Sequence, residues 1–226
     1  MIFTNYLTVN EQDTAWGLTI NTVGYQEVAP HSVYPPRDRN HPKKHMFNPE
    51  KGRILDEYQL IYIVDGSGTF EAASCGKTQI KAGDVFLLFP GEWHTYSPNK
   101  ETGWKEYWIG FKGYNMDDRV QSGFFKKEHP VYNIGFNDTI INLYNNAITI
   151  AYEQKKHFQQ LLAGIVSLIV GMAFSLHENR KLTNDHDQHI IDKARIFMQD
   201  RMETDLQMPE VAQHLNMSYS SFMMIC

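Results

Sequence analysis

The stretch YQLIYIVDGSGTF, residues 58–70, decides the fold class. Its first part, residues 58–64, is rich in β-branched and aromatic residues, which favour a strand. Residues 65–68 tolerate positive φ angles, so we expect a hairpin turn there and a return strand over residues 69–71. A second stretch, GDVFLLFPGEWH at residues 83–94, is apolar at every position from 85 to 89, which is typical of a strand buried on both faces.

A further strand is predicted at WKEYWIGF, residues 104–111. Between these segments, turn residues recur at intervals of roughly eight to twelve residues, and helical spacing is rare. The pattern favours a small antiparallel barrel or sandwich over residues 1–135, and a barrel of that size can hold one small ligand.

Residues 136–182 contain no proline and predict two helices with a corner at residues 155–157. The second helix includes LLAGIVSLIVGMAFSL, an uncharged run of 16 residues from 161 to 176. Because a bilayer requires roughly 20 such residues, we expect a helix buried in protein and no membrane span. The run is apolar nearly all round, which favours a dimer interface, with burial under the barrel as the alternative. The residues expected at that interface are Leu161, Gly164, Leu168 and Gly171.

The last segment, residues 187–226, returns to amphipathic helical spacing. Asp187 can cap a first helix, and Pro209 suits the first turn of a second one. Asn216 can take the left-handed position at the end of that helix, and Ser218 then opens another helix. This order predicts a helix-turn-helix unit, although any helical hairpin can mimic the spacing.

Composition limits the cell compartment and the partners. The chain has 226 residues, 42% of them hydrophobic, and a net charge of −5, so no overall basic field attracts nucleic acid or membrane. Two cysteines, Cys75 and Cys226, cannot build a disulfide framework, and the N-terminus lacks the order of a signal peptide. We therefore expect a cytoplasmic protein.

In this order, the motifs resemble the AraC/XylS family of bacterial transcription regulators. The resemblance is carried by residues 58–70, 83–94 and 209–222, and upstream by residues 34–36, 41–42 and 52–53. It implies an α+β chain that is mainly β with C-terminal helices: a cupin-like effector-binding barrel over 1–135, a helical pair for dimerisation over 136–182, and a truncated first helix-turn-helix over 187–226. The implied partners are a small-molecule effector, a second copy of the chain and, for the full-length protein, promoter DNA.

The chain departs from the family's pattern in its last segment, which lacks the second helix-turn-helix of the DNA-binding region. Residues 183–226 carry three basic residues against seven acidic ones, and this balance opposes binding to phosphates. We therefore expect little DNA affinity from the residues that open the recognition helix. These residues are Ser218, Tyr219, Ser220 and Ser221.

Residues 104–111 also carry the strongest candidate ligand site. Strand alternation places Trp104, Glu106 and Trp108 on one face, where indoles can stack on a sugar ring and a carboxylate can accept its hydroxyls. His94 and Tyr96 share a face of the preceding strand and can add polar contacts. The resemblance implies pocket roles for Tyr96, Glu106, Trp108 and Arg53. We expect a sugar or similar polar effector; the alternative is that these aromatic residues only fill the barrel.

A metal-dependent cupin enzyme, such as a sugar isomerase or dioxygenase, is the alternative function. His94 lies where such enzymes place their last metal ligand, but residues 58–70 contain no histidine, and one imidazole is not a metal site. The pairs His41 and His45, and His186 and His189, lack a third partner. The sequence therefore predicts neither a bound metal nor another cofactor, and no enzymatic activity.

Overall fold

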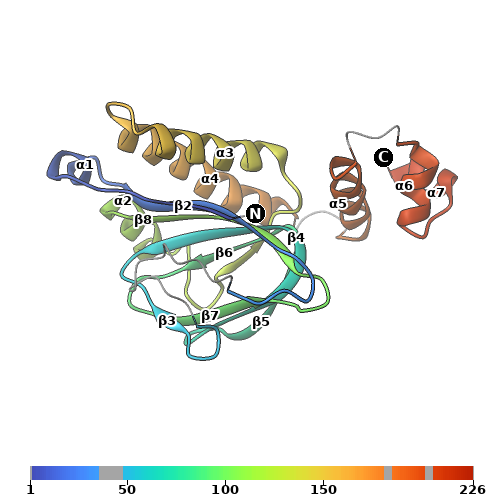
Figure 1. Cartoon of the computed structure of the whole chain (residues 1–226), viewed down its shortest axis with the longest axis horizontal. Coiled ribbons are helices and arrows are strands. Elements are labelled where there is room, and N and C mark those ends of the chain that lie inside the picture. Colours follow the sequence, from blue (N-terminus) through green and yellow to red (C-terminus); the bar gives the residue numbers. More distant parts are fainter. Residues whose placement is uncertain (1, 36–47, 181–184, 202–205, 226) are drawn as a thin grey trace.

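A computed structural model describes residues 2–35, 48–180, 185–201 and 206–225. An antiparallel barrel forms the body, with helices on one outer face and a helical unit at one side (Figure 1). The strands are β1 (Ile2–Tyr6), β2 (Thr19–Val28), β3 (Arg53–Ile54), β4 (Tyr58–Ala72), β5 (Gly76–Lys81), β6 (Asp84–Leu88), β7 (Trp93–Pro98), β8 (Trp104–Lys112) and β9 (Val131–Asn133). The helices are α1 (Glu11–Ala15), α2 (Tyr114–Gln121), α3 (Asp138–Glu153), α4 (Phe158–Arg180), α5 (Asp185–Gln199), α6 (Met208–His214) and α7 (Tyr219–Ile225). The prediction of a mainly β chain with C-terminal helices is confirmed.

Strand β4 joins the two sides of the barrel. Its first half pairs with β6 and β8, whereas its second half pairs with β5 and β7. The hairpin turn predicted at residues 65–68 is therefore wrong, because β4 runs through this segment and bends. The register shifts between Ile63 and Asp65, and Gly66 has a φ of 79°. A Cβ on Gly66 would lie 2.2 Å from the carbonyl oxygen of Gly103, so only glycine fits the bend.

The pleat of β8 separates two cores. Tyr107, Ile109 and Phe111 pack outward in a cluster shared with the helices, whereas Trp104 packs inward in the barrel cluster. The alternation predicted for residues 104–111 is confirmed. Each face of this strand is buried, since the helices cover the outside and other side chains fill the inside.

Helices α3 and α4 lie over the outer face of β2 and β8 (Figure 1). Gln159, 1% exposed, fixes α4 to the sheet where β2 departs from regular pairing. Its amide oxygen accepts from the backbone N–H of Ile20 at 2.9 Å, and its amide nitrogen donates to the carbonyl oxygen of Ile20 at 2.9 Å. These two bonds satisfy backbone groups that the irregular pairing would otherwise leave open.

Helix α4 is also long and apolar enough, by length and composition, to cross a membrane. The helix has 23 residues, more than the uncharged run seen in the sequence. One side belongs to the core of this chain, because Leu162, Val166 and Ile169 are buried against the sheet and α3. The opposite side is open. Leu161 is 59% and Leu168 50% exposed there, and no atom lies within 4 Å of the position of a Cβ on Gly164 or Gly171.

Helices α5, α6 and α7 pack on one another through a small apolar cluster that includes Ala194, Ala212 and Phe222. Pro209 lies in the first turn of α6, and Asn216 has a φ of 54°, as expected. The side chain of Ser218 accepts the backbone N–H of Ser221 at 3.1 Å and so caps the start of α7. Helix α5 begins at Asp185, so Asp187 lies inside it and is not its cap.

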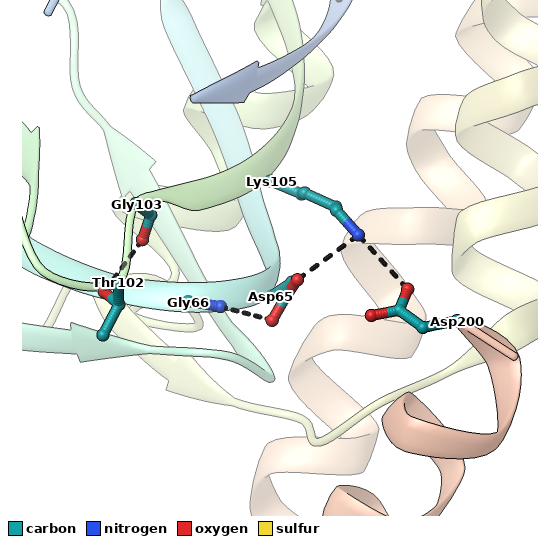
Figure 2. A network of polar contacts seen from close by, with 6 residues as sticks. All are labelled: Asp65, Gly66, Thr102, Gly103, Lys105 and Asp200. Atoms are coloured by element: carbon teal, nitrogen blue, oxygen red, sulfur yellow. Dashed lines mark hydrogen bonds and ion pairs between the residues drawn. The ribbon is translucent and has the colours of Figure 1, made fainter. Parts of the chain in front are cut away.

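Among the described residues, two ion pairs connect α5 and the residue that follows it to the barrel and to α4. Figure 2 shows the ammonium of Lys105, on β8, between the carboxylates of Asp65 and Asp200, at 3.3 and 3.2 Å. A second pair joins Arg180, at the end of α4, to Asp192 on α5 at 2.8 Å. The second pair is the more buried, with side chains 14% and 10% exposed.

Candidate functional site

A cluster of polar side chains lines the inside of the barrel around Arg53. The Arg53 guanidinium donates from Nη2 to the hydroxyl of Tyr96 at 2.9 Å and to Oε1 of Gln59 at 3.3 Å. Its Nε donates to Nε2 of His94 at 3.3 Å. The cluster draws on three strands, because Arg53 lies on β3, His94 and Tyr96 on β7, and Gln59 on β4. Residues far apart in the sequence thus converge on one cation.

His94 is held neutral in this cluster. Its Nδ1 lies 3.1 Å from the carbonyl oxygen of Glu92, to which it can donate, and its Nε2 accepts from Arg53. This network assigns the proton to Nδ1. Burial, together with the positive charge of Arg53, lowers the pKa of His94 to about 4. The ring is therefore a neutral hydrogen-bonding group over the physiological pH range.

Glu106 lies on the inner face of β8 and is 4% exposed. Burial raises its pKa to about 8, against the opposing effects of Arg53 and of the nearby Trp104 indole. A carboxyl group in this state is largely protonated at neutral pH, so it can both donate and accept a hydrogen bond.

One donor beside Glu106 has no hydrogen-bond acceptor in the part of the chain that the structure describes, namely Nε2 of Gln26, which pairs in register with Glu106. The indole N–H of Trp104 is directed at the Glu106 carboxyl group, whose pKa it helps to lower. Gln26 is 7% exposed, so bulk water does not satisfy its donor. Buried polar groups normally find partners, and their arrangement here suits a polar ligand.

Trp108 lies on the same inward face of β8 as Glu106, and it crosses β2 at Gly24. A Cβ on Gly24 would lie 2.2 Å from Cζ2 of the indole, so glycine makes room for the ring. The ring is half-buried and packs against the barrel cluster. The apolar indole face beside the polar Glu106 gives the cluster the combination of apolar and polar groups that is typical of a small-molecule site.

The structure brings together most of the residues that the sequence singled out for a ligand site. Arg53, His94 and Tyr96 are in direct contact, and the Tyr96 ring lies 6.2 Å from Trp104 between centroids. Sequence reasoning missed Gln59 and Gln26. Each is a single polar residue among mainly apolar neighbours, which the sequence shows, but its inward position follows only from how the strands close.

The other predicted residues lie elsewhere. Leu161, Gly164, Leu168 and Gly171 share the open side of α4. Ser218, Tyr219 and Ser220 are exposed at the start of α7, and Ser221 is half-buried. His41 and His45 lie outside the described residues, as does the side chain of His186. Within the described residues, no three His, Cys, Asp or Glu side chains are placed to hold a metal ion.

Comparison with known proteins identifies a family whose profile matches this chain. The profile of the family described as the AraC-like ligand binding domain matches residues 39–170. Over 70 residues, the chain is 43% identical to the raffinose operon transcriptional regulatory protein RafR of Pediococcus pentosaceus, a match that covers 31% of this chain and 25% of that protein. The match thus spans about a quarter of the curated relative's length.

Among solved structures, ToxT from Vibrio cholerae is 11% identical, with a TM-score of 0.39, over 92% of this chain and 74% of that chain. The protein YhaK from Escherichia coli is 16% identical, with a TM-score of 0.35, over 50% of this chain and 45% of that chain.

We predict a pH-dependent stability difference between the wild type and Glu106→Gln. The folded state holds a proton on Glu106 up to a pH of about 8, whereas the unfolded chain releases it near pH 4.5. Stability therefore falls as pH rises between these values, and glutamine removes the effect, which amounts to at most about 5 kcal/mol. Melting curves of both proteins from pH 5 to pH 8.5 measure the difference. The stability of Glu106→Gln relative to the wild type should increase steadily as the pH rises.

The exposed Glu128→Gln variant is the matched control and should follow the wild type throughout. His94 titrates in the opposite sense, since its lowered pKa makes stability fall as pH drops from about 6.5 to about 4. It is present in every variant, so it cancels from the difference. A Glu106→Gln difference that is constant with pH would contradict the assignment of a protonated Glu106.

Proposed function

Because the chain belongs to the family of AraC-like ligand binding domains, we propose that its barrel binds the small-molecule effector of a DNA-binding transcription regulator. The observation that carries this proposal is the polar cluster around Arg53 inside the barrel, with neutral His94 and protonated Glu106 beside it. Family membership favours this role over the enzymatic one, and a cytoplasmic location fits it.

The chemistry of the cluster supports a sugar or a similar polar molecule as the effector. Glu106 and His94 are neutral at physiological pH, so an uncharged ligand meets little electrostatic penalty. Tyr96, Gln26 and the Trp104 N–H can exchange hydrogen bonds with hydroxyl groups, while the Trp108 ring offers an apolar face. The relative in Pediococcus pentosaceus is, by its name, the regulator of a raffinose operon.

Strand β8 offers a route from this cluster to the C-terminal helices. Lys105 lies between Trp104 and Glu106, and its side chain points outward to Asp200, the residue that follows α5 (Figure 2). A ligand that moves β8 also moves this ion pair. Regulation then requires an effector that binds two arrangements of the pair with different affinity.

We predict that a sugar raises the melting temperature of the purified chain, and that Glu106→Ala or Trp108→Ala abolishes the rise. A ligand at 100 times its dissociation constant stabilises a fold by about 2.7 kcal/mol, which a thermal melt detects. The panel comprises monosaccharides, oligosaccharides, uronic acids and polyols. Trp16→Ala is the matched control, since Trp16 is 58% exposed and lies far from the cluster in the chain. No shift with any compound would rule out this effector class.

We predict a homodimer held by the open side of α4. Leu161 and Leu168 project from it, and the glycines at 164 and 171 let a second helix approach closely. Light scattering should give a dimer for the wild type at micromolar concentration and a monomer for Leu168→Asp. Val33→Asp, at another exposed apolar residue, should remain dimeric. A monomeric wild type, or a Leu168→Asp dimer, would contradict this interface.

We predict that this chain by itself does not retain operator DNA. The negative balance of residues 183–226 repels phosphates, which supply most of non-specific affinity. A gel shift with promoter fragments at physiological salt measures the affinity, with the individual residues Ser218–Ser221 as the contact candidates. Retention at nanomolar protein would show that these residues suffice for DNA recognition.

A further inference from the structure

A hollow opens at the edge of the barrel, beside the Arg53 cluster. Its volume is about 570 Å³, within the range of small-molecule sites. The wall is formed by the end of β1, the first residues of β2 and the segment between β3 and β4. Tyr6, Leu7, Asn21, Thr22 and Glu57 are among its lining residues. We call this hollow the mouth cleft.

Two residues that line the mouth cleft, Thr22 and Glu57, each bring a buried oxygen to the same space over Gly110. Glu57 is 3% exposed, and Thr22 is 2% exposed. A Cβ on Gly110 would lie 2.5 Å from Oε1 of Glu57 and 2.4 Å from Oγ1 of Thr22. Both oxygens therefore occupy the space over Gly110 that any other residue would fill, and the glycine is what lets them converge.

The missing hydrogen-bond partner of the Thr22 hydroxyl is the observation that indicates a ligand. Within the described residues, Oγ1 of Thr22 has no hydrogen-bond partner. A buried hydroxyl without a partner is costly, and few remain in a folded protein. Glu57, in contrast, is well held, because Oε2 accepts from Asn21 at 2.6 Å and Oε1 accepts from Gln59 at 3.1 Å.

The charges of the mouth cleft select an uncharged ligand. Asp56, at the rim, is paired with Lys112 at 2.6 Å. Burial raises the pKa of Glu57, while the hydrogen bonds from Asn21 and Gln59 oppose that rise. Apolar contact is available from Leu7 and Leu55, which also line the cleft. A neutral molecule with hydroxyl groups and an apolar ring face matches this lining.

Gln59 connects the mouth cleft to the Arg53 cluster. Its amide oxygen accepts from Arg53 at 3.3 Å, and its amide nitrogen donates to Glu57 at 3.1 Å. A single side-chain amide thus separates the two groups of polar residues. Ile54, which follows Arg53 in the chain, lines the cleft, so β3 contributes to both.

We propose that the mouth cleft is a second carbohydrate subsite, which takes the next ring of an oligosaccharide whose first ring lies against Arg53 and Glu106. This inference rests on the proposed function, since it assumes that the barrel binds a sugar. It goes further because it infers that Thr22 and Glu57 contact the ligand and that the effector is an oligosaccharide.

Titration calorimetry on the full chain tests the subsite with two series in which each member adds one ring: galactose, melibiose and raffinose, and glucose, maltose and maltotriose. In one series, we expect affinity to rise at least tenfold from the monosaccharide to the longer sugars. In Thr22→Val and in Glu57→Gln, the ratio of oligosaccharide to monosaccharide affinity should fall to threefold or less. Thr139→Val, at an exposed position on α3, is the matched control and should keep the wild-type ratio.

Thr22→Val leaves the fold intact, because the hydroxyl it removes has no partner among the described residues. Monosaccharide binding that Glu106→Ala abolishes, without any gain for longer sugars, would overturn the subsite and leave the proposed function standing. If the gain in affinity for the longer sugars persists in both Thr22→Val and Glu57→Gln, the subsite is likewise overturned and the proposed function stands. Absence of binding by every sugar in both series would overturn the subsite together with a sugar-binding barrel.

Discussion

The central constraint on this structure is that strands β4 and β8 are buried on both faces. Helices α3 and α4 cover the outside of these strands, so Tyr62 and Phe111 are fully buried there. The inner residues Ile61 and Trp104 are equally buried in the barrel. Burial on both faces removes water as a hydrogen-bonding partner, so every inward polar side chain must find one in the protein or in a ligand.

The barrel meets this requirement around Arg53 by sharing one cation among several neutral groups. Tyr96, His94 and Gln59 all accept hydrogen bonds from its guanidinium, whose planar fork directs donors to several acceptors at once. Burial, together with this positive charge, holds His94 neutral, and burial keeps the proton on Glu106. Within this cluster, Arg53 thus carries the formal charge and is surrounded by neutral polar groups, which can exchange hydrogen bonds with hydroxyl compounds.

Much of this arrangement could be predicted from strand periodicity. The alternation of residues 104–111 predicted correctly that Trp104 and Tyr107 lie on opposite faces of the strand, and the structure places them in different clusters. The bend of β4 could not be predicted in this way. Asp65 and Gly66 have the composition of a hairpin turn, and only the pairing of β4 with strands on both sides shows that the chain continues. Local preference and tertiary pairing disagree here, and pairing prevails.

The polar residues that the sequence analysis missed share a cause. Gln59, Gln26 and Glu57 are single polar residues within or beside apolar segments, where they resemble the outward residues of a half-exposed strand. Which face is inward depends on how the strands close, and a single strand does not contain that information. Arg53 was placed by family resemblance, and its contacts with His94 and Tyr96 come from the pairing of β3 with β7.

The energies of the two ion pairs on α5 assign them different roles. Arg180 and Asp192 are largely buried, and their oxygens and nitrogens crowd Gly135, whose φ is 70°. Breaking a buried pair by removing one partner costs about 3–5 kcal/mol, which is more than most ligands can offset through coupling. This pair is therefore a fixed attachment of α5 to the end of α4.

The Lys105–Asp200 pair contributes a much smaller free energy. Its side chains are 25% and 54% exposed, and pairs of that kind contribute about 0–1 kcal/mol. Coupling between a ligand site and a distant element is typically about 1–3 kcal/mol, enough to break or strengthen such a contact. Because Lys105 adjoins Glu106 on the same strand, it is the contact with α5 that a ligand in the barrel can change, while Arg180 and Asp192 hold the helix in place.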